Sequence, residues 1–429
     1  MSISEPRVNA AAPTGTGQNY GPAMFVVSSV FFMWGFVTVL NDILVPHLKA
    51  IFELNYTETM LIQFTFFLAY FLISMPAARV IAWIGYHRTI VLGLAVMACG
   101  ALMFLPAASV PSYGLFLTGL FVLASGMTLL QVSANPYVTV LGPPERASVR
   151  LNLVQALNSV GTTIGPWVGG LFILSQTTRS AAERNAMAPD QLQAYRLLEA
   201  STVKLPYVAI AGLLILLAVG IAKFPFPRLE QIEDPEHHAH VPGDSVWRHR
   251  NLVLGAIGIF VYVGAEVAIG SFLVNYFMQP NIGGLTAQTA ARHVSFYWGG
   301  AMVGRFIGSA VLRRMGTGKL VGIHAVVACA LVTTSILTTG SVAMWSILLV
   351  GLFNSIMFPS IFTLGIAGLG RLTGTASGIM IAAIVGGAII PVLEGALADR
   401  IGLHAAFVLP AVCYVYIMFY GFVGSKPRS

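Results

Sequence analysis

The sequence predicts an all-α membrane protein with twelve transmembrane helices in two pseudo-symmetric six-helix bundles. Three observations support this fold class: the composition, the number of long apolar runs, and a repeat between the two halves of the chain. Of the 429 residues, 56% are hydrophobic and only 9% are charged, whereas a soluble domain has about 25% charged residues. Despite the net charge of +7, this composition excludes a single soluble core, a disordered chain and a nucleic-acid-binding protein.

Long apolar runs give the number of spans, because a helix needs about 20 mostly apolar residues to cross a bilayer. The first run contains Asn41 and Asp42 and is longer than the apolar core of a secretory signal, so we expect it to be retained. Short polar or Gly/Pro-bearing turns separate the runs. The expected spans are 24–48, 58–80, 89–107, 113–140, 150–175, 203–223, 251–278, 292–312, 319–338, 342–366, 373–397 and 404–424.

The distribution of lysine and arginine predicts the orientation of the chain. With the N-terminus inside, the inner segments hold 15 of the 23 basic residues and the outer loops hold 7, while Arg305 lies within a span. Basic residues concentrate in cytoplasmic loops, so we expect both termini in the cytoplasm. The expected setting is the inner membrane of a bacterium, where the chain would act as a multi-pass monomer.

The repeat divides the spans six and six. Residues 224–250 form the only long polar segment in the middle of the chain, and landmarks recur across it at a nearly constant offset. Asp42 corresponds to Glu266 (224 residues later), as Pro136 does to Pro359 (223). Two parallel six-helix repeats are the pattern of the major facilitator fold, in which the substrate site lies near mid-membrane between the halves.

This repeat predicts the division of the chain into domains and tails. We expect a flexible N-terminal tail, an N-terminal six-helix bundle, a cytoplasmic linker, a C-terminal six-helix bundle and a short C-terminal tail. Their expected limits are 1–21, 22–223, 224–250, 251–424 and 425–429.

Apart from Glu58, the first residue of a span, three acidic residues fall inside the expected spans: Asp42, Glu266 and Glu394. A carboxylate deep in a span costs roughly 2.5–3.5 kcal/mol on insertion scales, so each should face a polar interior unless it lies near a helix end. We expect Glu394, close to the outer end of its helix, to reach the headgroups. Asp42 and Glu266 should face one central cavity, either as cation-coupling and ligand-binding carboxylates or as members of structural pairs, with Arg305 or an amide as partner.

Carboxamides in the N-terminal half supply candidate ligands for a hydroxylated substrate. Gln155 and Asn158 are three residues apart and share a helix face, and Gln131 and Asn135 lie on the preceding span. Carboxamides both donate and accept hydrogen bonds, which matches the demands of sugar hydroxyls without requiring charge. The alternative is that these amides join helices to one another.

The corresponding candidates in the second half are Asn275, Tyr297, Trp298, Asn354 and Phe358. An aromatic face can cover the apolar surface of a pyranose while amides bind its hydroxyls, although aromatic residues in membrane helices also serve in packing. The cysteines and histidines show no ligand spacing. We therefore expect no metal site and no cofactor, apart from H⁺ or Na⁺ as a coupling ion.

Several motifs resemble those of the fucose–proton symporter family, over nearly the whole chain apart from its tails. Two lie in the N-terminal half, at Leu40–Pro46 and Ala134–Pro143, and the second is followed by Arg150-Leu151-Asn152-Leu153. In the second half, Phe358–Phe362 and Ile384–Gly387 also match, and Tyr262–Phe272 is more similar to the glucose/galactose branch.

The resemblance implies roles for individual residues. It implies that Asp42 is a proton-linked carboxylate and that Gln155 and Asn158 contact sugar. Where the fucose symporter has a glutamate in span four, this chain has Gln131, which cannot titrate, and Val39 replaces an asparagine of the fucose branch.

The expected function is therefore cation-coupled import of a monosaccharide by alternating access. D-Glucose or D-galactose is favoured over L-fucose or an amino sugar, and a proton over sodium. Asp42 and Glu266 are the expected coupling residues. The expected substrate-binding residues are Gln131, Gln155, Asn158, Glu266, Asn275, Trp298 and Asn354.

Three alternatives to this function make different demands on the sequence. An efflux transporter of the same fold would have an aromatic, acid-lined pocket with few amides. A transport-inactive sugar receptor is compatible with the sequence. A membrane-embedded enzyme is disfavoured, because no span contains a metal-ligand cluster or a nucleophile–base pair.

Overall fold

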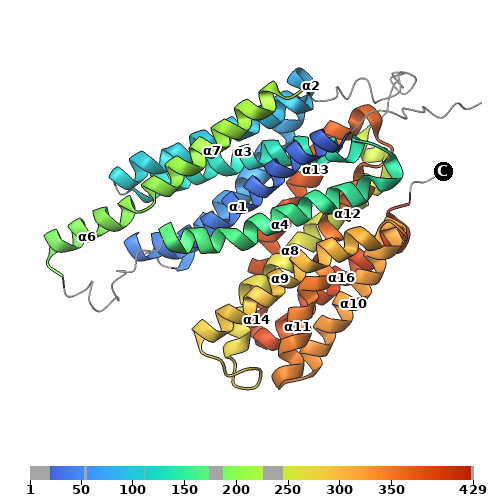
Figure 1. The fold of residues 1–429 in the computed structure, drawn as a ribbon. Helices are drawn as coiled ribbons and strands as arrows, with labels where there is room; N and C mark the ends of the chain where they lie inside the picture. Colours follow the sequence, from blue (N-terminus) through green and yellow to red (C-terminus); the bar gives the residue numbers. More distant parts are fainter. Residues whose placement is uncertain (1–19, 53–55, 111, 173–186, 226–244, 427–429) are drawn as a thin grey trace, which may run out of the picture.

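The computed structural model describes residues 20–52, 56–110, 112–172, 187–225 and 245–426. Within these ranges, the side chains at 40–51, 56–60, 166–172, 189, 193, 196, 199, 200, 287 and 288 are outside the description. The described chain folds into helices joined by short turns (Figure 1).

The first group of helices covers the N-terminal half. Gly85, with φ of 78°, turns the chain inside α2, the second of these helices. Helix α2 therefore contains both of the expected spans 58–80 and 89–107. Glycine adopts this backbone conformation without the steric cost of a Cβ atom. The group comprises α1 (Gly21–Phe52), α2 (Tyr56–Ser109), α3 (Tyr113–Val140), η1 (Pro144–Arg146), α4 (Ala147–Phe172), α6 (Pro189–Ser201) and α7 (Lys204–Lys223).

The second group covers the C-terminal half, and several of its spans are interrupted. The helix break between Asn354 and Met357 lies just before Pro359, which has no backbone N–H to give. The group comprises η4 (Val246–Arg248), α8 (Arg250–Met278), α9 (Ala287–Val311), α10 (Thr317–Leu337), α11 (Gly340–Asn354), α12 (Met357–Ile366), η5 (Gly370–Leu372), α13 (Thr373–Ala382), η6 (Ala383–Val385), α14 (Gly386–Ile401), α15 (Leu403–Ala406), α16 (Val408–Phe419) and η7 (Tyr420–Gly424).

The length and composition of the helices agree with a multi-pass membrane protein. In the described ranges, nine helical stretches are long and apolar enough to cross a membrane, and the stretch Leu61–Ser109 contains the two spans joined at Gly85. The two expected spans that this criterion leaves out correspond to α4 and α9, which have 26 and 25 residues and a less apolar composition. Ser159 of α4 and Arg305 of α9 bond each other across the contact between the halves.

Helix packing repeats across the two halves. In the first half α1 packs against α4, and in the second half α8 packs against α14 in the equivalent place. Contacts between the halves are also paired, since α4 packs on α9 and α13 packs on α2. The fold is therefore built from two pseudo-symmetric bundles, as the repeat in the sequence predicted.

Small residues set how closely the helices approach. A Cβ atom at Gly161 of α4 would collide with the carbonyl oxygen of Phe32 in α1, and one at Gly386 of α14 would collide with that of Phe260 in α8. The two glycines are 225 residues apart, which is the offset of the repeat. Close approach through glycine is a common device of membrane helix pairs.

The molecule has two distinct ends, which we name from the residues that lie there. At the Arg150 end, the guanidinium of Arg150 donates to the carbonyl of Val138 (3.1 Å), an acceptor that the end of α3 leaves free, and to that of Pro143 (2.8 Å). The opposite end carries α6 and is called the α6 end. In Figure 1 the two halves converge towards the Arg150 end and separate towards the α6 end.

Several of the described hydrogen bonds between the halves lie towards the Arg150 end. Ser148 accepts a hydrogen bond from Thr317 (2.9 Å). Asn152 donates to Ser360 (3.2 Å), and Ser377 of α13 donates to the carbonyl of Val132 (2.9 Å). Hydroxyl and amide pairs of this kind hold the two bundles together where their helices converge.

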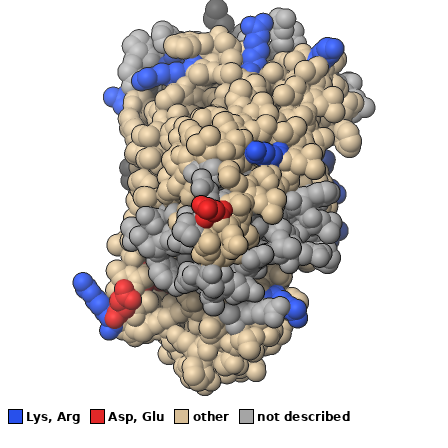
Figure 2. Space-filling view, turned by 90° about the vertical axis from the view of Figure 1, so that its left-hand side faces the viewer, with Lys and Arg blue, Asp and Glu red and all other residues tan. Residues whose placement is uncertain are grey.

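The outer surface of the helices is apolar, as contact with lipid requires. Large hydrophobic side chains such as Trp83 (80% exposed), Leu216 (69%) and Val392 (68%) lie open on it. Figure 2 looks at the molecule from the left-hand side of Figure 1; on that face the charged residues are few and scattered among uncharged ones. Such a surface is stable in a bilayer and not in water.

Candidate functional site

Two carboxamides of α3 lie buried side by side on one helix face. Gln131 is 3% exposed and donates to the Tyr70 hydroxyl of α2 (2.7 Å), while its Oε1 atom has no hydrogen-bond partner. Asn135, one turn further along α3, is fully buried, and neither polar atom of its side chain has a partner. Buried polar groups in folded proteins are nearly always hydrogen-bonded, so α3 presents unsatisfied donors and acceptors.

The polar face of α4 continues this pattern. Gln155 is 3% exposed, and its Nε2 atom has no partner. Asn152 has a free Oδ1 atom. Asn158, in contrast, donates to the carbonyl of Phe31 in α1 (2.9 Å). Of the two α4 residues predicted to bind substrate, Gln155 therefore keeps its amide nitrogen free, while Asn158 uses its amide nitrogen to hold α1.

Glu266 lies in α8 beside the contact between the halves. Its side chain is half-buried, its Oε1 atom has no hydrogen-bond partner, and it interacts electrostatically with Tyr262 and Arg305. Arg305 of α9 donates to Ser159 of α4 and to the carbonyl of Ser355 (3.1 Å). One cation thus connects the carboxylate of one half with a hydroxyl of the other.

Asn354 belongs to a hydrogen-bond network inside the C-terminal bundle. It is fully buried, its Oδ1 atom accepts from Tyr414 (2.8 Å), and its Nδ2 atom donates to Tyr297 (2.9 Å). The Tyr262 hydroxyl donates to its backbone carbonyl (3.1 Å). This predicted substrate-binding residue instead organises three tyrosines, because its side-chain acceptor and donor are both engaged there.

The two other candidates of the second half are more exposed. Trp298 is 47% exposed, and its indole lies against Gly270 of α8, one turn after Glu266. Asn275 is exposed and lies nine residues beyond Glu266 on α8, a rise of about 13 Å along the helix. The structure therefore places Trp298 near Glu266 and leaves Asn275 apart from the other polar residues, towards the α6 end.

The structure bears differently on the predictions for the two remaining carboxylates, those of Asp42 and Glu394. Asp42 lies in α1, one turn after Thr38, and its side chain is outside the described residues. The expectation that Glu394 reaches the headgroups is wrong, because its side chain is 0% exposed. Its helix is covered there by α8 and α15, contacts that the sequence position alone did not reveal.

Sequence reasoning also missed residues that the structure brings into the site. Tyr414 of α16 and Tyr262 of α8 meet Asn354 at the end of α11 only in the folded bundle, and nothing in the sequence separates them from packing tyrosines. Ser159 was visible as a polar neighbour of Gln155, but its bond to Arg305 joins residues that are 146 positions apart.

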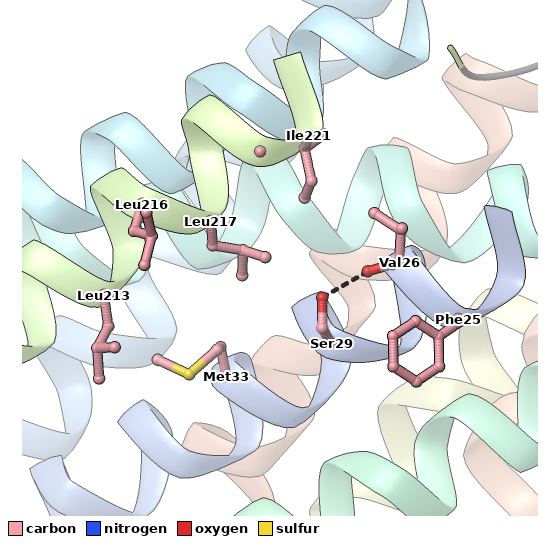
Figure 3. Close-up of a pocket in the computed structure, with 9 residues that line it drawn as sticks. Phe25, Val26, Ser29, Met33, Leu213, Leu216, Leu217 and Ile221 are labelled. Carbon is pink, nitrogen blue, oxygen red and sulfur yellow. Dashed lines mark hydrogen bonds between the residues drawn. The ribbon is translucent and has the colours of Figure 1, made fainter. Parts of the chain in front are cut away.

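Away from these polar residues, an apolar groove lies between α1 and α7 (Figure 3). It has a volume of about 410 Å³, and its one hydroxyl, that of Ser29, donates to the carbonyl of Val26 (2.6 Å) in its own helix. Its lining is apolar and contains no free polar side chain, so the groove does not suit a sugar. The lining residues are Phe25, Val26, Ser29, Met33, Leu213, Leu216, Leu217, Gly220 and Ile221.

The comparisons with known proteins agree with this geometry. Residues 24–385 match the Major Facilitator Superfamily. The chain belongs to this superfamily. It is 53% identical to the glucose/galactose transporter of Brucella abortus, over 99% of this chain and 100% of that protein. It is 34% identical to the L-fucose-proton symporter of Escherichia coli, over 95% of this chain and 94% of that protein.

A solved structure of the superfamily shares the fold in detail. The transporter FucP, crystallised in the outward conformation, matches with a TM-score of 0.86 and 32% identity, over 95% of this chain and 100% of that one. Within the superfamily, the chain is thus similar to sugar transporters of the fucose–proton symporter group, as the motifs of the sequence predicted.

Proposed function

We propose that this chain imports a monosaccharide, D-glucose or D-galactose in preference to L-fucose, into a bacterial cell by proton-coupled alternating access. The observation that carries the proposal is the set of buried carboxamide atoms without hydrogen-bond partners on α3 and α4, at Gln131, Asn135 and Gln155. Unsatisfied donors and acceptors on two helices that are in contact suit a ligand with many hydroxyls. The names of the relatives favour the same substrate class.

The contacts between the halves support alternating access. Several of the described hydrogen bonds lie towards the Arg150 end, which we propose to be cytoplasmic, and the outward conformation of FucP matches this arrangement. The bonds of Ser148 to Thr317 and of Asn152 to Ser360 would have to break for the substrate to leave on that side. In this proposal the structure represents the state that opens away from the cytoplasm.

Arg305 provides a physical route from cation binding to this movement. It bonds Ser159 across the contact between the halves, and its charge interacts with Glu266 in its own half. A charged Glu266 attracts the guanidinium away from Ser159, whereas a protonated Glu266 does not. Proton binding would therefore strengthen the bond between the halves, and proton release would weaken it.

The proposal is tested with the purified protein in liposomes. With an acidic exterior and a neutral interior, we expect accumulation of D-glucose or D-galactose above its equilibrium level, and none when the pH gradient is collapsed. A sodium gradient at equal pH serves as the matched comparison. Accumulation driven by sodium alone would contradict proton coupling. Absence of sugar exchange between the two sides would contradict the proposal that the protein transports sugar.

We expect the substitution Gln155→Ala to weaken sugar binding about tenfold, since a buried hydrogen bond contributes roughly 0.5–1.5 kcal/mol. Asn251→Ala is the matched control, because that buried amide already donates to the carbonyls of Leu364 (3.1 Å) and Gly365 (3.2 Å). The control should lower thermal stability without changing affinity. Sugar affinity is measured by scintillation proximity or calorimetry in detergent, and a Gln155→Ala protein with unchanged affinity would place the sugar elsewhere.

A further inference from the structure

Glu394 of α14 is a buried acid that the proposed site does not use. Its side chain is 0% exposed, and neither of its carboxylate oxygens has a hydrogen-bond partner among the described residues. It lies seven residues before Ile401, the last residue of the helix, and therefore about 10 Å from the α6 end of α14. An ionised carboxylate in such a place has lost its hydration and gained nothing in exchange.

The surroundings of Glu394 are the tyrosine network of the C-terminal bundle. Glu394 interacts electrostatically with Tyr297, with Tyr414 and with the Cys413 thiol. Tyr297 and Tyr414 also interact with Glu266, and both bond the side chain of Asn354. The two glutamates therefore lie around one network, and both act on the same two tyrosines.

The network reaches the main chain beside Glu266. The Tyr297 hydroxyl donates to the carbonyl of Glu266 (3.3 Å), and through Asn354 the same network includes Tyr414. Its members come from helices α8, α9, α11 and α16. A change of charge at Glu394 thus acts on groups that hold the backbone at Glu266.

The other titratable groups near α14 do not supply a counter-charge. Those on the elements packed against it include Tyr262 and Tyr276 of α8, Tyr70 of α2 and His404 of α15, whose Nε2 bonds the Ser335 carbonyl (2.9 Å). On α14 itself, Asp399 and Arg400 are exposed. In the described part of the chain, Arg305 is the cation that interacts with Glu266, and Glu394 has no such partner.

We infer that Glu394 is a second proton-binding site of the transport cycle, in the C-terminal bundle and nearer the α6 end than Glu266. A proton from the water at that end forms an O–H bond with a Glu394 oxygen, and the neutral acid is the form that the dry surroundings accept. Release of that proton leaves two carboxylates around one network. The inference rests on the proposed function, because it concerns the proton that drives transport.

The test compares Glu394→Gln with the wild type in liposomes. The amide has the shape of the acid and cannot exchange a proton, so we expect sugar counterflow within twofold of the wild type and loss of accumulation driven by a pH gradient. Proton uptake on sugar addition, followed with a pH indicator in weakly buffered detergent solution, should fall by about one proton per protein. Asp399→Asn, an exposed acid five residues further along α14, is the matched control and should behave as the wild type.

Each outcome of the test decides the inference. Accumulation and proton uptake equal to the wild type in Glu394→Gln would show that Glu394 holds a permanent, structural proton, and would overturn the inference alone. A wild type that does not respond to a pH gradient would overturn the proposed proton coupling as well. If Glu394→Gln cannot be purified, Glu394→Asp takes its place: it should keep accumulation with a shifted pH profile, and an unshifted profile contradicts the inference.

Discussion

The substitution Asp42→Asn is expected to abolish sugar accumulation driven by a pH gradient while leaving sugar exchange between the two sides intact. An asparagine side chain matches the shape of aspartate but cannot bind and release a proton, so movement of the halves would continue without being tied to the gradient. Uptake of labelled sugar into liposomes measures accumulation, and counterflow at equal pH measures exchange.

The control for this substitution is Asp190→Asn, an exposed acid on α6, which should accumulate sugar as the wild type does. Unchanged accumulation in Asp42→Asn would remove Asp42 from the coupling mechanism. Loss of both accumulation and counterflow would instead give Asp42 a role in the movement itself or in sugar binding.

A disulfide between positions 148 and 317 is expected to stop transport completely. The side-chain oxygens of Ser148 and Thr317 are 2.9 Å apart across the contact between the halves, so thiols introduced at the two positions would lie close to each other. The double variant Ser148→Cys/Thr317→Cys should lose counterflow after oxidation and regain it after reduction. Sugar binding in detergent should persist, because neither Ser148 nor Thr317 belongs to the proposed binding site.

The single variants Ser148→Cys and Thr317→Cys are the controls for this cross-link. They also contain Cys99, Cys329 and Cys413, so any oxidation effect that comes from the native thiols appears in them too. Counterflow that continues in the fully cross-linked protein would show that the Arg150 end need not open, and would contradict alternating access across this contact.

The fold class was predictable because the length and apolar composition that a membrane span requires can be read directly along the sequence. A span needs about 20 apolar residues, and this single requirement yielded the spans at 58–80 and 89–107 although the structure joins them in one helix label around Gly85. The offset of about 224 residues between Asp42 and Glu266 predicted the two bundles, whose paired helix contacts the structure then showed.

The candidate site was predictable only in part. Gln131 and Gln155 were expected to face a polar interior, and the structure buries both with an atom left unsatisfied. Asn158 and Asn354 were chosen by the same reasoning, but they bond Phe31 and the tyrosines. An amide in a span must satisfy its polar atoms somewhere, and whether it does so with a neighbouring helix or with a substrate depends on which side chain faces it.

From the amino-acid sequence alone, a membrane protein of two six-helix bundles could be predicted, with acids and amides inside its spans, because apolar length and the repeat can be read along the chain. That Glu394 is enclosed, that Arg305 bonds Ser159 across the halves, and that Ser148 meets Thr317 became visible in the folded bundles. These features arise between helices far apart in the chain. The distances that make them depend on the packing of whole bundles and not on any local pattern.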